Sequence, residues 1–264
     1  MAEAAGTQAV LDPVTYLDRV RATETGRRAV DRSLEHLALG SGHRVLDIGC
    51  GTGDEVLRAA ERVGPGGVFA GLDLNRAMVL EARARAGRAK GPGGFFQGDA
   101  HQLCFADESF DRIRFSRVIQ HLKSPAAVLA EAVRVSRRGG RVVAGEPDWE
   151  TLVVHSEDRA ITRKVLNFIC DVRVRNGWIG RQLPFLFKEA GLVDVAVENI
   201  TGIERDLEQA DQFWGIRRNA HRACQAGAVT AGERDGWLAG LQRLQDADCF
   251  FSSLSGFIVS GRRP

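Results

Sequence analysis

Three glycines alternate with other residues directly after a short apolar run, as Gly49, Gly51 and Gly53. The apolar run ends in Asp47, is too short for a helix, and is followed by helix-forming sequence from residue 55. We therefore predict a buried strand, a glycine loop and a helix. Because glycine has no Cβ, a ligand can lie directly against such a loop, near the positive end of the helix dipole. The pattern indicates a ligand site at the carboxyl end of a strand.

This stretch resembles the first motif of the class I S-adenosylmethionine-dependent methyltransferases, whose loop has the same acidic-x-Gly-x-Gly-x-Gly form. Residues 71–75 resemble the end of the second strand of that family, 98–100 its adenine-side motif, and 110–122 its fourth strand and loop. The resemblance covers roughly residues 16–146 and is more specific than a lone glycine motif. It implies an α/β fold with a doubly wound, Rossmann-like sheet of seven mostly parallel strands, and S-adenosyl-L-methionine as the cofactor.

The resemblance also implies cofactor-binding residues. Asp73 would accept hydrogen bonds from both ribose hydroxyls, although it could instead cap the next helix. Asp99 and the backbone of Ala100 would meet the adenine edge, or Asp99 could be an ordinary turn acid. Asp47 would order the loop and so belongs with binding rather than catalysis. The other cofactor candidates are Gly49, Cys50, Gly51, Gly53, Leu74, His101 and Ser116, with Tyr16 and Arg19 either reaching the methionine carboxylate or facing solvent.

A base is needed only if the methyl acceptor must lose a proton, because methyl transfer depends mainly on alignment. His121, just after the predicted fourth strand, is one catalytic candidate, since an imidazole titrating near neutrality can take a proton. A structural hydrogen-bonding role for His121 is the alternative. Glu146, after the predicted fifth strand, is the second candidate, with a solvated loop acid as its alternative.

Candidate substrate-binding residues lie in the second half of the chain. The segment 173–182 combines three arginines with a tryptophan, and these could clamp an anionic or planar substrate. Ion pairs from the same arginines to Glu157, Asp158 or Asp171 are an equal alternative. Aromatic residues at helical spacing could equally fill a core. The substrate-binding candidates are Trp149, Arg175, Trp178, Phe213 and Trp214.

Strand-like and helix-like segments alternate from residue 41 to residue 147, which predicts a parallel sheet with helices on both faces and ligands beyond its carboxyl edge. We divide the chain into a helical lid (1–40), a cofactor-binding core (41–147), a helical substrate cap (148–190 and 204–247) and the last strands of the core sheet (191–203 and 248–264). In the core we expect, among others, helices over 54–63 and 125–135 and a strand over 68–73. In the cap we expect one helix over 156–176, with Ser156 as its N-cap and Val172 on its apolar face, one continuous helix over 207–225, and another over 231–246.

Composition narrows the class of protein. The net charge of +2 over 264 residues gives no electrostatic footprint for nucleic acid or an anionic membrane. Five scattered cysteines argue against a disulfide framework and a zinc site, so we expect no metal and a cytoplasmic location. The sequence lacks a signal-like start and any apolar run long enough to span a membrane. It does not predict the oligomeric state.

These observations favour an enzyme that methylates oxygen, nitrogen or carbon of a small molecule, such as a specialised metabolite in natural product biosynthesis. A protein or nucleic-acid methyltransferase is the alternative, although residues 116–119 lack the signature of enzymes that methylate base amino groups. A cyclase that binds S-adenosylmethionine without transferring methyl stays open too. A nicotinamide dehydrogenase would have the spacing G-x-G-x-x-G, from which this loop departs at its third glycine.

Overall fold

The structure, a computed structural model, describes residues 12–87 and 93–264. Within these residues the strands form one eight-stranded sheet in the order β3-β2-β1-β4-β5-β8-β6, with β7 also paired to β8. The five strands from β3 to β5 are parallel, whereas β8 runs antiparallel to β5, β6 and β7. The strands are β1 (Arg44–Ile48), β2 (Val68–Asp73), β3 (Gly93–Gln97), β4 (Phe110–Ser116), β5 (Ser136–Pro147), β6 (Val153–Val154), β7 (Val193–Glu204) and β8 (Ser252–Arg262).

This order confirms the predicted doubly wound α/β sheet, with β6 as a short addition to the seven strands expected. Successive residues of a strand point to opposite faces, so Val45 and Leu46 of β1 lie in two different apolar clusters. The Val45 side is covered by α2 (Glu24–His36) and α3 (Asp54–Val63), and the Leu46 side by α5 (Pro125–Val135) and α7 (Ile179–Glu189). Helix α4 (Arg76–Ala86) packs beside α3 near β2 and β3.

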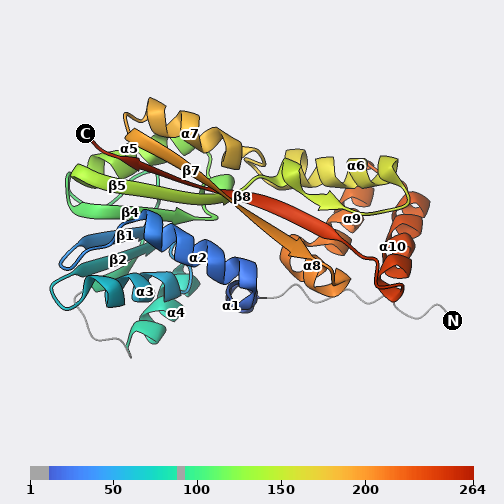
Figure 1. The fold of residues 1–264 in the computed structure, drawn as a ribbon, viewed down its shortest axis with the longest axis horizontal. Helices are drawn as coiled ribbons and strands as arrows, with labels where there is room; N and C mark the ends of the chain where they lie inside the picture. Colours follow the sequence, from blue (N-terminus) through green and yellow to red (C-terminus); the bar gives the residue numbers. More distant parts are fainter. Residues whose placement is uncertain (1–11, 88–92) are drawn as a thin grey trace.

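Strands β7 and β8 extend beyond the rest of the sheet and lead to the helical cap (Figure 1). The cap has its own apolar core, shared by α6 (Arg159–Phe168), the π-helical turn η3 (Ile169–Arg173), α8 (Leu207–Trp214), α9 (Ile216–Gln225) and α10 (Ala231–Asp246). Helix α7 packs against the sheet instead, through Ile179, Leu183 and Phe187. The cap boundary predicted at residue 190 therefore differs from the packing, which places α7 with the core.

Two cap helices differ from the prediction for local reasons. Helix α6 begins at Arg159, because Asp158 is its N-cap and accepts the backbone N–H of Ile161 at 2.9 Å, while Ser156 only accepts the N–H of Asp158. The expected continuation to residue 176 ends in η3, which turns Val172 outward to 68% exposure. The expected helix over 207–225 breaks at Gly215, whose φ of 68° is left-handed. Ser156 as N-cap, Val172 as core and a single helix over 207–225 were therefore wrong.

The lid consists of α1 (Pro13–Ala22) and α2, joined at Thr23. Thr23 caps α2 by accepting the backbone N–H of Gly26 at 2.9 Å. Helix α2 buries Val30 and Leu34 against the sheet, whereas α1 has no buried residue and lies across the carboxyl ends of the strands. In the described ranges no helix combines the length and apolarity needed to cross a membrane.

Candidate functional site

The glycine loop between β1 and α3 has no room for a side chain at two of its glycines. Gly49 and Gly53 have φ values of 75° and 80°, in the left-handed region. A Cβ on Gly49 would lie 2.2 Å from a methyl carbon of Val118, and one on Gly53 would lie 2.7 Å from the Phe95 ring. Gly53 caps α3 without a side-chain acceptor, so the first backbone N–H groups of α3 are open to a ligand.

Asp73, at the tip of β2, is bound to this loop. Its Oδ2 accepts the backbone N–H of Gly51 at 2.9 Å, and its Oδ1 accepts that of Asn75 at 2.8 Å. Asn75, not Asp73, is the N-cap of α4, since its side chain accepts the N–H of Ala77. The helix-cap alternative for Asp73 is therefore wrong. The carboxylate is half-buried, beside a Leu74 side chain that is 68% exposed at the edge of the sheet.

Asp99 and His101 form a pair near the next strand end. Asp99 Oδ1 lies 2.7 Å from His101 Nδ1 and accepts the His101 backbone N–H at 2.9 Å. These bonds, the backbone one first, lower the pKa of Asp99. His101 Nε2 accepts the backbone N–H of Ser124 at 3.3 Å, which fixes its proton on Nδ1. Ala100 is buried, while the Asp99 side chain is 56% exposed and so is open to a ligand.

Asp47 lies behind the loop in a buried ion cluster. Arg114 of β4 is 3.2 Å from the Asp47 carboxylate, 2.8 Å from Glu55 and 3.0 Å from the hydroxyl of Ser33. Burial raises the pKa of Asp47 to about 7, although Arg114 opposes the shift. This cluster connects β1, β4, α2 and α3, which agrees with an ordering role for Asp47. The sequence prediction missed Arg114, whose signal is an arginine directly between two apolar residues of a strand, Ile113 and Phe115.

The lid is held over the glycine loop by Arg21, which the sequence prediction did not single out. Arg21 donates to Thr52 Oγ1 at 2.5 Å and is ion-paired with Asp54, the first residue of α3. Arg85 of α4 lies 2.9 Å from Asp18 and 2.8 Å from Asp54, which adds a second link to α1. Arg19 is exposed and faces a cavity farther out.

Tyr16 of the lid lies near the loop after β4. The Arg117 guanidinium is 5.8 Å from the centre of the Tyr16 ring, and the Tyr16 hydroxyl donates to the carbonyl of Phe213 at 3.4 Å. Arg117 has φ of 55°, which is unusual for a residue with a side chain. Tyr16 therefore joins the lid to the cap and to the strand end where Ser116 lies.

Two cavities lie between the lid, the strand ends and the cap. The inner cavity, of about 170 Å³, extends from Arg21 and Glu55 past Ser116 and Gly145 to α8. The outer cavity, of about 620 Å³, lies between the α1–α2 junction, the end of β7 and α8. Both are lined by Thr23, Thr25, Glu204 and Phe213. The predicted residues Phe213 and Trp214 thus lie at the inner cavity, and Ser116 and Glu146 line it too.

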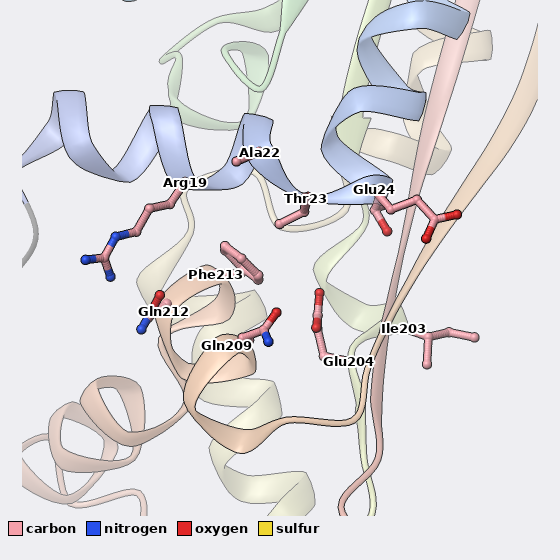
Figure 2. Close-up of a pocket in the computed structure, with 10 residues that line it drawn as sticks. Arg19, Ala22, Thr23, Glu24, Ile203, Glu204, Gln209, Gln212 and Phe213 are labelled. Atoms are coloured by element: carbon pink, nitrogen blue, oxygen red, sulfur yellow. The ribbon is translucent and has the colours of Figure 1, made fainter.

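Figure 2 shows how side chains meet in the outer cavity. The Phe213 ring, the Gln209 amide and the Glu204 carboxylate turn toward its middle, whereas Glu24 and Ile203 point away. Burial, followed by the charge of Asp206, raises the pKa of Glu204. In the described part of the chain its carboxylate has no hydrogen-bonding or ion-pair partner. Glu204 is a site residue that sequence reasoning missed, because nothing in the sequence distinguishes it from other acids after strands.

The two catalytic candidates differ in their surroundings. Glu146 is 2% exposed and accepts the backbone N–H groups of Val118 at 2.8 Å and Ile119 at 2.7 Å, with Gln120 at 3.5 Å. Burial raises its pKa to about 7, although these bonds oppose the shift. This geometry suits a residue that holds the short helix η1 (Ile119–His121) in place, rather than the solvated acid that was the alternative.

His121, the last residue of η1, lies outside the lining of both cavities. Partial burial, then the charges of Arg173 and Arg117, lower its pKa. Its imidazole is therefore neutral at pH 7 and can accept a proton. In residues 12–87 and 93–264 it has no hydrogen-bonding partner, so the structural role proposed as its alternative has no contact to support it.

The predicted clamp in segment 173–182 does not form at either cavity. Arg181 binds both carboxylate oxygens of Asp148, at 2.5 and 2.7 Å, and pairs with Glu150 as well. Its guanidinium lies 5.2 Å from the centre of the Trp178 ring. Arg175 and Trp178 are exposed and line neither cavity. Ion pairing, the alternative, holds for Arg181, although with other acids than those expected.

Trp149 is partly buried and donates from Nε1 to Gln120 Oε1 at 2.8 Å, so it supports η1 rather than lining a cavity. Cys50 is buried beside Val56 and Phe95, with its pKa raised by burial, and its side chain belongs to the core. Within the described ranges no group of three histidine, cysteine or acidic side chains could hold a metal ion.

Comparisons with known proteins agree with this geometry. A family model described as a methyltransferase domain matches residues 39–190. An uncharacterized 37.1 kDa protein in transposon TN4556 of Streptomyces fradiae is 39% identical over 252 residues, which cover 95% of this chain and 71% of the relative. Demethylmenaquinone methyltransferase of Staphylococcus aureus is 26% identical over 185 residues, which cover 65% of this chain and 76% of the enzyme.

The solved structures agree at the level of the fold. The YcgJ protein of Bacillus subtilis superimposes with a TM-score of 0.64 at 20% identity, covering 90% of this chain and 98% of YcgJ. The [4+2]-cyclase SpnF gives a TM-score of 0.55 at 21% identity, covering 90% of this chain and 81% of the cyclase. The same fold thus carries more than one chemistry, and the acceptor must be argued from the site.

Proposed function

The chain belongs to the methyltransferase-domain family and is an S-adenosylmethionine-dependent methyltransferase, and from this premise we propose that it methylates oxygen, nitrogen or carbon of a small molecule. A specialised metabolite is the acceptor class we propose. The observation that carries the proposal is the inner cavity, which reaches Ser116 and Gly145 at the ends of β4 and β5 and is covered by the lid and by α8. An acceptor inside it would be enclosed on several sides, as a small molecule can be.

The residues at the strand ends fit the cofactor. The start of α3, which has no side-chain cap, leaves its first backbone N–H groups free for a ligand next to the left-handed Gly53. The carboxylate of Asp73 and that of Asp99, each partly open to solvent, offer acceptors for ribose hydroxyls and for an amino group. Leu74 offers an exposed apolar surface for a planar base.

In the proposed mechanism the protein mainly positions the acceptor and excludes water. Bound S-adenosylmethionine supplies a methyl group on an already activated sulfonium. Glu146 holds the backbone of η1, and thus the loop after β4, against the inner cavity. Alignment of this kind contributes several kcal/mol to a group transfer. For acceptors that lose a proton we propose His121 as the base, because its imidazole is neutral and has no partner in the described residues. His121 lines neither cavity, so such an acceptor would have to extend from the inner cavity to η1.

Glu204 and Phe213 would then select the acceptor, since both line the outer as well as the inner cavity. A partly buried carboxylate without a partner favours a hydrogen-bond donor or a cation on the acceptor. An aromatic ring beside it favours a flat or apolar portion. Replacing Glu204 by Gln should change which acceptors are used without changing cofactor affinity.

The test is to incubate the protein with methyl-labelled S-adenosylmethionine and separate pools of small molecules, proteins and nucleic acids. Label in a small molecule, with one S-adenosylhomocysteine formed per methyl group, is the expected result. Label in macromolecules alone would contradict the proposal. A product formed without cofactor turnover would favour the cyclase alternative instead.

A further inference from the structure

The inner cavity holds little more than one ring. Its volume of about 170 Å³ is close to the roughly 150 Å³ of a protein cavity that binds one benzene molecule. The outer cavity, of about 620 Å³, has the size of sites for larger ligands. Because Thr23, Thr25, Glu204 and Phe213 line both cavities, the two adjoin. A methyl acceptor larger than a single ring would therefore extend from the inner cavity into the outer one.

The two cavities offer different surfaces to such an acceptor. The inner cavity has an apolar wall, to which Val30, Ile200, Leu254 and Ile258 contribute. Polar side chains dominate the outer cavity, with threonine hydroxyls, glutamine amides and the Glu204 carboxylate among them. An acceptor that fills both would thus have an apolar part of about ring size and a polar part that lies farther from the ends of β4 and β5.

The carboxylate of Glu204 is the charged group that faces the middle of the outer cavity (Figure 2). Among the described residues no group donates a hydrogen bond to it or forms an ion pair with it. Arg19 lines the same cavity, but its guanidinium points away from Glu204 (Figure 2). Asp206, whose charge adds to the raised pKa of Glu204, is itself used as the N-cap of α8 and accepts the backbone N–H of Gln209 at 2.8 Å. Glu204 is therefore a partly buried acid, with a second acid nearby and no cation beside it.

The other two acids of β7 have cationic partners. Asp194 lies 2.7 Å from Arg262, and Glu198 lies 2.7 Å from Arg32. Of the three β7 acids, Glu204 alone lacks a partner within residues 12–87 and 93–264, and it alone lines either of the two cavities. Partial burial of an unpaired carboxylate is unfavourable, because water bonds are lost and no cation replaces them. A ligand with a positive charge in the outer cavity would remove this cost.

We propose that the outer cavity binds an ammonium group carried by the methyl acceptor, with Glu204 as its counter-ion. The Phe213 ring and the Gln209 amide face the same space, so an ammonium there also gains an aromatic neighbour and a further hydrogen-bond acceptor (Figure 2). A neutral hydroxyl could bond to Glu204, but only a cation also offsets the negative charges of Glu204 and Asp206. The assignment of the ammonium to the acceptor rests on the proposed function, whereas the cation site itself does not.

The proposal also separates the anchored group from the methylated atom. An ammonium paired with a carboxylate keeps its proton and has no free electron pair to receive a methyl group. The methylated atom is therefore a different one, held in the inner cavity near Ser116 and Gly145 at the ends of β4 and β5. The acceptor class is an amine whose reactive oxygen, nitrogen or carbon lies on its apolar part.

The test is calorimetric titration of the full chain with 2-phenylethylammonium, which joins one ring to an ammonium group. Saturable binding is expected, and 2-phenylethanol, with a hydroxyl in place of the ammonium, should bind about tenfold more weakly. Glu204→Gln should weaken binding of the amine about tenfold and leave 2-phenylethanol unaffected. Glu24→Gln is the matched control, because Glu24 lines the same cavity but points away from its middle, and it should change neither affinity. No saturable amine binding, equal affinity for both probes, or equal weakening in Glu24→Gln would overturn the proposal.

Two further readouts separate a binding role of Glu204 from a structural one. Wild-type affinity for 2-phenylethylammonium should fall as the pH is lowered toward the raised pKa of Glu204, because a protonated carboxyl does not attract a cation. This fall should be absent in Glu204→Gln, and since Asp206 and Glu24 are present in both proteins, the difference belongs to Glu204. Ligand-free Glu204→Gln should unfold at the wild-type temperature or higher, because an unpaired charge is removed. A lower unfolding temperature with unchanged amine affinity would overturn the proposal.

A competition experiment tests the assignment to the acceptor. Saturating 2-phenylethylammonium should reduce the transfer of labelled methyl groups to the small-molecule pool, whereas 2-phenylethanol at the same concentration should reduce it less. Undiminished transfer with the amine bound would overturn the assignment. Amine binding without any methyl transfer to small molecules would count against the proposed function and not against the cation site.

Discussion

Replacement of Glu146 by Gln and by Ala would show whether this buried acid is a base or a residue that positions η1. Gln keeps an oxygen for the backbone N–H groups of Val118 and Ile119, which Glu146 now accepts at 2.8 and 2.7 Å. Ala leaves both N–H groups without an acceptor. Each buried, unpaired N–H costs about 1–3 kcal/mol, so Glu146→Ala should lower the free energy of unfolding by roughly 2–5 kcal/mol.

The pH dependence of the free energy of unfolding gives a second test of Glu146, with its own expected size. Burial raises the pKa of Glu146 from 4.5 to about 7, so the folded protein retains a proton that the unfolded chain has already lost between these pH values. The stabilisation is complete below pH 4.5 and is lost as pH rises to about 7, above which the difference is constant. At 1.36 kcal/mol per pKa unit the total is roughly 3 kcal/mol. Glu146→Gln does not titrate and should therefore gain that amount relative to wild type across the window.

Urea unfolding of wild type and Glu146→Gln at half-unit steps from pH 4.5 to pH 8 measures this difference, since contributions from other groups cancel. Parallel curves for the two proteins would refute the reasoning. Initial rates on the same samples separate the roles. A positioning residue predicts near wild-type kcat for Glu146→Gln and a large loss for Glu146→Ala. A loss of about a hundredfold or more in both variants would identify Glu146 as the base after all.

Three other changes have defined outcomes. Asp73→Ala should weaken S-adenosylmethionine binding about 10- to 100-fold, because it removes charged acceptors at the strand tip; unchanged affinity in calorimetry would contradict the assignment. His121→Ala should cut kcat by about a hundredfold or more if His121 is the base. In the wild type, kcat/KM should fall only at pH below about 6.5, because the pKa of the His121 imidazole is lowered from its ordinary value. Activity of His121→Ala within a few-fold of wild type would exclude His121 as a base. Bonds from Arg32, then His36, lower the pKa of Glu198 to about 2, so the stability that Glu198 adds is present above pH 4.5 and is lost between pH 4.5 and 2. Glu198→Gln should cost on the order of 1 kcal/mol at pH 7, allowing for solvent screening, and should flatten this acid limb in urea titrations.

Local patterns in the sequence were sufficient for much of the fold. The helices predicted over 54–63, 125–135 and 231–246 and the strand over 68–73 have the bounds observed in α3, α5, α10 and β2. In each case an N-cap residue, a proline or a glycine lies next to an end of the element. The apolar residues inside the element follow a single spacing, that of a helix or that of a strand, along its whole length. The glycine loop was predictable for a similar reason. It needs left-handed backbone at Gly49, Gly51 and Gly53, and glycine is the residue type that adopts this conformation most readily.

The predicted helix boundaries were wrong where tertiary packing determines the backbone conformation of one or a few residues. Both sides of Gly215 have helical apolar spacing, and the break between α8 and α9 depends on one left-handed residue. Helix α6 ends early because η3 widens the turn, and Val172 then faces solvent. A sequence pattern based on 3.6 residues per turn cannot predict such a change to a wider helical turn.

Charge partners were the least predictable part of the site, because they join residues far apart in the sequence. Arg114 meets Asp47 and Glu55, and Arg21 meets Asp54, only after the lid and the parallel sheet have formed. Arg19 and Arg21 are chemically alike in the sequence, yet one faces the outer cavity and the other is ion-paired over the glycine loop. The same reasoning bears on segment 173–182. Its composition suggests an arginine clamp, but in the folded chain Arg181 pairs with Asp148 and Glu150, two acids that the sequence pattern did not identify as its partners.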